Sequence, residues 1–463
     1  MGDDLIIQTD HVELSAGEAA FRKRLNRKID LRVIPFLIVL LMFCLIDRTN
    51  IGTAKVAGMG EDLNLDGNKY SVALLVFFLL YTILEIPSIS IIRLVGVRNL
   101  LAGMVLGWGV VSMCHAFVNT YAQLVVVRLL LGMFEAGFQP ACIYLISSWY
   151  TRYETQHRLA VWFTSGNILA AFSGIISYGL SLQHGVGGLE GWRWIFLVPG
   201  LITVVLTLPI WFWASEFPEK AKWLAPEELT FLRRQLQDDR AETLDEKLTS
   251  AKVLNSVQDW RVWVLSSLLF FVTASVYTLT FFTPTILNSI GFSVEMSQIL
   301  VTPPYIFGSL VSIATGILAD KLHMRSPFII AHLVLQMLGF VLIGWGPNIG
   351  SRMTGIFFSV AGSLSAIPTV YAFLANNVVG ASKRQISVPL QTTFGGIGGI
   401  AGSLYFRQQD FPNYRPGLYA TFTSLGLCLI ITSSMGLYFW SQNRKADRKG
   451  KILEGLEGFR YTI

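Results

Sequence analysis

The chain has 463 residues, of which 52% are hydrophobic and only 14% are charged, and its mean hydropathy is +0.53. A soluble domain carries about a quarter charged residues, so this composition excludes an ordinary soluble enzyme and indicates a surface that faces lipid. The net charge of +6 comes largely from Lys and Arg in polar segments and short loops between apolar runs. That pattern is typical of loops retained in the cytosol and argues against nucleic-acid binding.

The first thirty residues are polar and lack the short apolar region of a signal peptide, so we expect residues 1–30 to be a cytosolic tail. Twelve apolar runs follow, each long enough to cross a bilayer as a helix at a rise of about 1.5 Å per residue. They lie at about 31–55, 70–92, 99–117, 122–146, 159–182, 193–214, 261–285, 297–319, 327–345, 352–374, 386–405 and 416–440. The fifth and eleventh are rich in Gly and Ser, which predicts buried, closely packed helices.

The loops indicate the orientation of these spans. Basic residues follow the second, fourth, eighth and tenth spans, whereas the loops after the third and seventh contain none. This alternation predicts that both termini lie in the cytosol. The long polar stretch at 215–258 divides the chain into two sets of six spans, and leucines at helical spacing predict a surface helix at about 226–240.

The predicted fold is an all-α membrane protein with twelve transmembrane helices in two pseudo-symmetric six-helix bundles. The bundles are expected at 31–214 and 259–440, with a cytosolic linker at 215–258 and a cytosolic tail at 441–463. A 6+6 arrangement of this kind is typical of secondary transporters, in which the pathway runs between two repeats.

Charged residues inside spans are costly and usually face a partner or a water-filled cavity. The first span contains Asp47 and Arg48, the second Glu85, and the fourth Arg128 and Glu135. Arg128 and Glu135 are two helical turns apart and share a face, whereas the adjacent Asp47 and Arg48 point about 100° apart. A buried ion-pair network that only locks the helices together is the alternative to a functional site.

Arg48 is the candidate for anion binding, because its permanently charged fork matches a carboxylate. Asp47 and Glu135 can gain and lose protons as their surroundings change, which suits proton-coupled uptake of an organic anion. Glu85 is open between a gate, a proton relay and a structural role. The chain lacks metal-ligand spacing and a phosphate-binding loop, which argues against an enzyme or an ATP-driven pump.

Five motifs resemble, in order along the chain, the anion:cation symporter branch of the major facilitator superfamily. They are Asp47-Arg48-Thr49-Asn50-Ile51-Gly52; Arg128 to Gly137 with Pro140; Gly191-Trp192-Arg193-Trp194; Asn376-Asn377 with Gly380, Lys383 and Arg384; and Asp410 with Pro412 and Tyr414. Gly316 with Asp320, Lys321 and Arg325 also looks like a signature of the superfamily. The motifs near the end are similar to fungal allantoate and nicotinate permease-like members.

The resemblance implies an alternating-access carrier for small carboxylates that needs no bound cofactor and is driven by a proton gradient. It implies proton sites at Asp47 and Glu135, substrate binding at Arg48, and Arg128 as a partner in the same network. It further implies gating by polar residues near the cytosolic ends of spans eight and ten, namely Asp320, Lys321, Arg325, Asn376, Asn377, Lys383 and Arg384.

The eleventh span departs from the family pattern. Many relatives carry Gly-Asn where this chain reads Gly395-Gly396 followed by Gly398-Gly399. The missing polar side chain predicts a roomier or less polar pocket and favours an aromatic or less hydroxylated acid over a sugar acid. Tyr277 of the seventh span is a candidate for lining the same pocket, with packing as the equal alternative.

The sequence thus predicts proton-coupled import of a small organic monocarboxylate, nicotinate-like or allantoate-like, by a monomer in the plasma membrane. Its expected partners are the anion, protons and the lipid bilayer. Export of an acidic metabolite on the same fold is the first alternative. A nutrient sensor is the second, although only about twenty residues follow the last span and sensors of this fold usually carry long cytosolic extensions.

Overall fold

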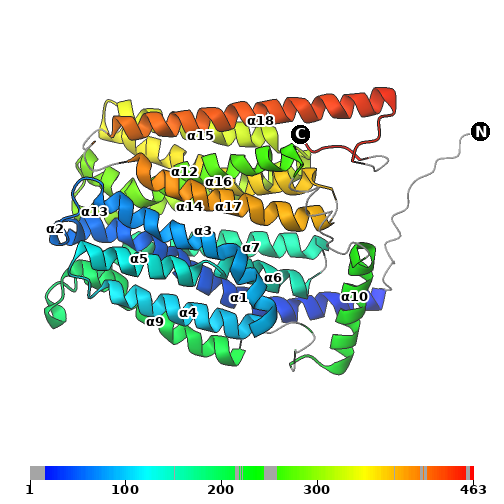
Figure 1. Cartoon of the computed structure of the whole chain (residues 1–463), viewed down its shortest axis with the longest axis horizontal. Coiled ribbons are helices and arrows are strands. Elements are labelled where there is room, and N and C mark those ends of the chain that lie inside the picture. The colour runs from blue at the N-terminus through cyan, green and yellow to red at the C-terminus, as the bar shows by residue number, and fades with distance from the viewer. Residues whose placement is uncertain are drawn as a thin grey trace, which may run out of the picture.

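The computed structural model describes residues 16–150, 152–213, 218, 221, 223–244, 258–379, 381–406, 410, 414–454 and 459–463. Figure 1 shows long helices side by side in two halves, with the N-terminal half at the bottom and the C-terminal half at the top. The first half contains α1 (Ala16–Ala54), α3 (Lys69–Val95), α4 (Val97–His115), α5 (Tyr121–Glu135), α6 (Phe138–Trp149), α7 (Arg152–Ala170), α8 (Ser173–Ser181) and α9 (Gly191–Trp213), with the short α2 (Gly60–Asp62) after α1. The second half contains α12 (Trp260–Ile290), α13 (Val294–Ile299), α14 (Thr302–Leu322), α15 (Ser326–Trp345), α16 (Ile349–Asn377), α17 (Ala381–Tyr405) and α18 (Arg415–Lys449).

These helices form twelve membrane spans. In the described part of the chain, nine helical segments are long and apolar enough to cross a membrane. The helix α3, the pair α7 and α8, and α17 occupy the places of the remaining three. The predicted all-α, twelve-helix fold is therefore confirmed, and the protein is an integral multi-pass membrane protein.

Three spans that the sequence predicts as single helices are each divided in two. The fourth is split between α5 and α6 at Ala136–Gly137, the fifth between α7 and α8 at residues 171–172, and the eighth between α13 and α14 at residues 300–301. At the first break, a Cβ on Gly137 would lie 2.1 Å from the Met104 side chain and 2.7 Å from that of Ser88. The break thus lies where α3 and α4 approach too closely for a larger residue.

The helices also extend into the predicted tails. α1 begins at Ala16 and α18 continues to Lys449, so parts of the polar segments expected as tails are helical. The linker contains α10 (Pro226–Leu244), which confirms the predicted surface helix. It packs on the first bundle, where the Phe21 and Phe231 rings lie 5.0 Å apart and Lys28 pairs with Glu228 at 2.6 Å.

Glycines let α17 pack closely on its neighbours, as the sequence predicts for the eleventh span. A Cβ on Gly398 would lie 2.4 Å from the Phe270 carbonyl oxygen of α12, and one on Gly402 would lie 2.2 Å from that of Ala274. A Cβ on Gly396 would likewise lie 2.4 Å from the Thr82 hydroxyl oxygen of α3. The expectation of a roomier pocket at these glycines is wrong, because neighbouring helices fill the space that side chains would occupy.

The two bundles meet at one end of the molecule. We call the end where α1 begins and α18 finishes the termini end, at the right of Figure 1, and the opposite one the far end. At the far end, the Tyr70 hydroxyl of α3 donates to the Phe281 carbonyl of α12 at 3.2 Å, and the Ser71 hydroxyl donates to the Phe406 carbonyl at 3.4 Å. A Cβ on Gly52 would lie 2.9 Å from the same Phe281 oxygen. The structure is therefore closed at the far end.

Ion pairs at the termini end do not join the two bundles in the described part of the chain. In the first, Arg158 of α7 pairs with Asp30 of α1 at 2.7 Å. In the second, Lys383 at the start of α17 pairs with Asp259 just before α12. The described ion pairs thus stabilise each bundle separately at this end.

Candidate functional site

A cavity lies between the two bundles near the middle of the spans. Its volume is about 150 Å³, which is below the roughly 300–1,000 Å³ of sites for drug-sized ligands and fits a small solute. Side chains from α1, α6, α7, α8, α12, α14 and α16 line it. Arg48 is the only residue with a charged side chain among the described residues that line it.

Arg48 lines the cavity and contacts residues of both bundles. Its Nη2 and Nε donate to Oε2 of Glu135 at 2.9 and 3.2 Å, and its Nη1 donates to the Tyr277 hydroxyl of α12 at 3.0 Å. The Tyr81 and Phe77 rings of α3 lie 4.8 and 5.1 Å from the guanidinium carbon, which adds cation–π attraction. Arg48 is only 2% exposed, so rings and hydrogen bonds hold its fork in one position.

Glu135 lies behind Arg48 and is fully buried. One carboxylate oxygen accepts from Arg48, and the Cys44 thiol approaches the same oxygen at 3.7 Å. The other oxygen, Oε1, has no hydrogen-bond partner in the described residues. A buried carboxylate with one free oxygen beside an arginine is a group whose protonation would change the charge balance of the site.

Asp47 points away from the cavity, as the angle between adjacent helical residues predicts. The Ser112 hydroxyl of α4 donates to it at 3.0 Å and that of Thr203 of α9 at 3.4 Å. It is fully buried within the first bundle and does not line the cavity. The structure therefore brings Arg48, Glu135 and Tyr277 together and places Asp47 in a second polar cluster.

Arg128 does share a buried face of α5 with Glu135, but that face does not open into the cavity. Its Nε donates to the Ala73 carbonyl of α3 at 3.4 Å, and its guanidinium carbon lies 5.3 Å from the Phe77 ring. Nη1 and Nη2 have no hydrogen-bond partner among the described residues. Arg128 thus places a positive charge next to the Phe77 ring and does not line the cavity.

Glu85 of α3 is 3% exposed, and its Oε2 has no hydrogen-bond partner among the described residues. It interacts electrostatically with Arg48 and with Tyr371 of α16. Glu85 is therefore a buried carboxyl group whose charge acts on residues of both bundles.

The predicted gating residues lie at the termini end of the second bundle, away from the cavity. Asp320 forms an ion pair with Arg325 across the α14–α15 turn, whereas Lys321 is exposed at the end of α14. Asn376 is half-buried at the end of α16.

Two more of these residues contact the segment after α18. Asn377 hydrogen-bonds to the backbone of Thr462, and Lys383 pairs with Asp259 and Glu454. The side chain of Arg384 lies outside the described residues.

Sequence reasoning missed most of the hydroxyl-bearing wall of the cavity. Tyr305 of α14 donates to the Thr280 hydroxyl of α12 at 3.2 Å, and Asn167 of α7 donates to its own helix at Phe163 O. Neutral polar residues inside apolar runs carry a weak signal, because most of them bond to their own backbone. Asn167, in the Gly- and Ser-rich fifth span, was the clearest available signal.

No group of three or more His, Cys, Asp and Glu side chains in the described part of the chain has the arrangement of a metal site. The cavity therefore offers one cationic fork, several hydroxyl and amide groups, and an apolar wall that includes Leu364, Ile367 and Pro368. These groups fit a small anion with an uncharged body.

Comparison with known proteins identifies the family. Residues 37–403 match the sequence profile of the Major Facilitator Superfamily. The "MFS-type transporter cnsO" of Penicillium expansum is 30% identical over 97% of this chain and 90% of its own length. The "High-affinity nicotinic acid transporter" of Saccharomyces cerevisiae is 27% identical over 96% of this chain and 83% of its own.

Among solved structures, the inward-facing, unoccupied form of a bacterial homologue of the human lysosomal transporter Spinster has the same fold. Its TM-score is 0.64 at 16% sequence identity, with 91% of this chain and 96% of that chain covered. These relatives are transporters and not enzymes. The chain therefore belongs to the major facilitator superfamily of membrane transporters.

Proposed function

We propose that the protein imports a small organic monocarboxylate together with protons across the plasma membrane, as a monomer with both termini in the cytosol. The observation that carries this proposal is the position of Arg48, a buried cation at the wall of a cavity that contains no other charged side chain among its described lining residues. A cation in a low-dielectric site binds an anion strongly and rejects a second cation.

The contacts of Arg48 support a coupling mechanism. Nε and Nη2 are bonded to Glu135, whereas Nη1 reaches Tyr277 across the cavity. An incoming carboxylate competes with Glu135 for the same fork. Protonation of Glu135 removes its negative charge, so the proton and the substrate anion bind together more favourably than either does alone. Glu85 and Asp47 are further proposed proton sites.

The substrate class follows from the shape and chemistry of the cavity. One fork fits one carboxylate, and the hydroxyls of Tyr277, Thr280 and Tyr305 offer hydrogen bonds to a ring nitrogen or a carbonyl. The apolar wall suits a flat, uncharged body. A nicotinate-like acid meets these requirements, and the similarity to a nicotinic acid transporter adds support.

The direction of transport rests on orientation and on the bundle contacts. The basic loops favour cytosolic termini, so the far end would face outward and is closed here. In this state the cavity would exchange solute with the cytosol. Opening the far end while closing the termini end would complete an alternating-access cycle.

The test is uptake of labelled nicotinate and a panel of carboxylates into proteoliposomes at two external pH values. We expect accumulation driven by an inward proton gradient in the wild type and its loss in Arg48→Ala. Arg48→Lys keeps the charge but loses the planar fork, so a large part of the uptake should also be lost.

Full uptake by Arg48→Ala, with normal amounts of protein in the vesicles, would overturn the anion site. Accumulation that depends on an outward gradient would instead support export.

A further inference from the structure

The chain folds back after α18 across the termini end of the second bundle, as the red trace in Figure 1 shows. We call Glu454 together with residues 459–463 the tail clasp. Its contacts reach residues of α12, α16, α17 and α18 and the turn before α15. It therefore touches most of the helices whose ends must move if this end of the cavity is to close.

Two asparagines bind the backbone of the clasp. Asn443 of α18 accepts from the Tyr461 N–H at 2.9 Å and donates to the Tyr461 carbonyl at 2.8 Å. Asn377 of α16 does the same for Thr462, at 2.8 and 3.0 Å. The Arg325 N–H donates to the carbonyl of Ile463. Paired donor and acceptor bonds of this kind fix an extended peptide in one register.

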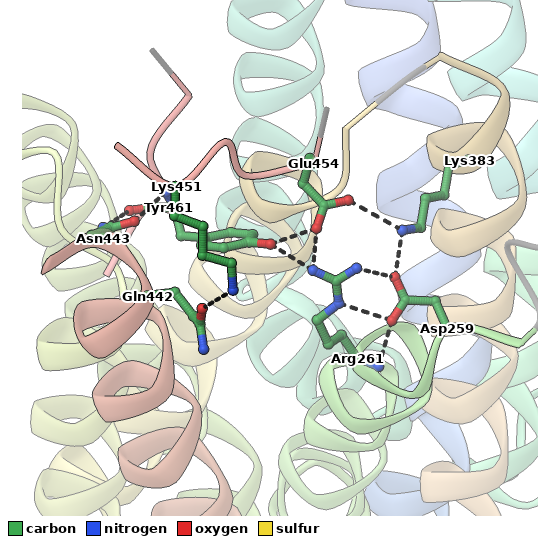
Figure 2. A network of polar contacts seen from close by, with 8 residues as sticks. All are labelled: Asp259, Arg261, Lys383, Gln442, Asn443, Lys451, Glu454 and Tyr461. Carbon is green, nitrogen blue, oxygen red and sulfur yellow. Dashed lines mark hydrogen bonds and ion pairs between the residues drawn. The ribbon is translucent and has the colours of Figure 1, made fainter. Parts of the chain in front are cut away.

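A charged cluster fixes the other part of the clasp (Figure 2). Arg261 lies between the carboxylates of Asp259 and Glu454, and Lys383 contacts the same two carboxylates from the start of α17. The Tyr461 hydroxyl donates to Glu454 at 2.5 Å and accepts from Arg261 at 2.6 Å. Two cations thus face two anions, and the clasp supplies one of the anions.

The Tyr461 ring anchors the clasp by packing. It stacks on Phe439 of α18 with ring centroids 4.5 Å apart and an angle of 22° between the planes, and it is 5% exposed. An aromatic side chain buried to this extent contributes far more than an exposed one, because its apolar area is removed from water.

We propose that the tail clasp stabilises the conformation that is closed at the far end, by holding the termini ends of α16 and α17 against α12 and α18. Its anchors include Asn377, Lys383 and Arg325, which belong to the gating set predicted from sequence. α16 and α17 contain Pro368 and Pro389, where helices bend readily, so their ends are able to move toward the first bundle. The clasp opposes that movement, and its release favours the opposite conformation.

The test measures conformation without substrate. Spin labels at Val95 and Leu322, both about half exposed, report the separation of α3 and α14 at the termini end. Labels at Phe117 and Ile349 report the far end. The exposed Cys114 is replaced by Ser, and distances are measured by pulsed electron paramagnetic resonance in lipid nanodiscs.

Tyr461→Ala is expected to shift the termini-end distance to shorter values and the far-end distance to longer ones. Tyr461→Phe keeps the stacked ring and loses only the bonds to Glu454 and Arg261, so it should shift both distances in the same directions by less. Tyr461→Phe also tests the proposal on its own if the Tyr461→Ala variant does not fold.

Arg460→Ala is the matched control within the clasp, because Arg460 contacts α18 through an ion pair to Asp447 in which both side chains are exposed, and such pairs contribute little to stability. It should leave both distances unchanged. Unchanged or oppositely shifted distances in the Tyr461 variants would overturn the proposal. Because no substrate is present, the distances do not depend on the proposed carboxylate transport. The clasp proposal and the transport proposal can therefore be disproved separately.

Discussion

The Arg48 guanidinium of α1 donates to the Tyr277 hydroxyl of α12 at 3.0 Å, so one hydrogen bond joins the two bundles at the cavity. Tyr277→Phe removes this acceptor but keeps the ring against Phe78 and Phe281. A hydrogen bond to a charged group contributes about 1.5–3 kcal/mol, so we expect the KM for the carboxylate to rise about tenfold or more. Initial rates of uptake in proteoliposomes measure this.

Tyr305→Phe is the matched control for the Tyr277 prediction. Tyr305 also lines the cavity, but its hydroxyl bonds to Thr280 and does not contact Arg48. Its loss should raise the KM for a short carboxylate much less. An equal rise in both variants would show that the hydroxyl of Tyr277 has no special relation to the anion.

Glu135→Gln should separate exchange from concentrative uptake. The amide oxygen still accepts from Arg48, so the geometry of the fork is retained, but the side chain no longer takes up or releases a proton. We expect exchange of labelled for unlabelled substrate to continue, while accumulation driven by a pH gradient is lost. Accumulation at the wild-type level would show that Glu135 does not carry the proton.

Asp47→Asn should act differently, because Asp47 contacts Ser112 and Thr203 and not Arg48. We expect the KM at saturating proton concentration to stay near that of the wild type and the pH dependence of uptake to change. Parallel measurements at pH 5.5 and 7.5 distinguish the two carboxyl groups. A KM that rises as much as in Tyr277→Phe would contradict the separation of the two polar clusters.

Much of the fold follows from the lengths of the apolar runs, since a run of about 20 residues has few alternatives to a spanning helix. The breaks at Ala136–Gly137 and at residues 171–172 were not predictable, because they lie inside such runs and arise from contacts with other helices. Helical spacing placed Arg128 and Glu135 on one face, but which helix covers that face depends on tertiary packing.

The contacts of the tail after α18 depend on tertiary packing even more strongly, so the sequence does not predict them. Its sequence mixes apolar and polar residues without a clear period, yet Thr462 bonds to Asn377, which lies 85 positions earlier. The cavity hydroxyls were missed for a related reason, since Thr280 and Tyr305 become neighbours only when α12 and α14 pack together.

Gly132→Ala is expected to destabilise the first bundle. A Cβ at this position would lie 2.1 Å from the Phe77 carbonyl oxygen of α3, so α3 and α5 would have to move apart. Overpacking of this kind costs about 1–3 kcal/mol. Gly103→Ala is the control, because nothing lies within 4 Å of a Cβ there. Thermal unfolding in detergent should show a lower midpoint for the first variant only.

The two carboxyl groups in the charged cluster of the tail clasp should not titrate in the physiological range. Burial alone would raise the pKa of Asp259, but hydrogen bonds from Arg261 and Lys383 lower it to about 2. Burial is likewise outweighed at Glu454, whose pKa is lowered by bonds to Arg261 and Tyr461. A carboxyl whose pKa is depressed on folding stabilises the fold above its unfolded pKa, near 4, and loses that effect as the pH falls further.

Hydrogen exchange of the Tyr461 and Thr462 amides, corrected for the intrinsic rate, should therefore show the same protection at pH 7.5 and 5.5. Glu454→Gln leaves Arg261 and Lys383 with a single carboxylate partner in Asp259, so protection should fall at both pH values. Loss of protection at pH 5.5 in the wild type would contradict the assignment. If protection persists, the clasp does not account for any pH dependence of transport in this range.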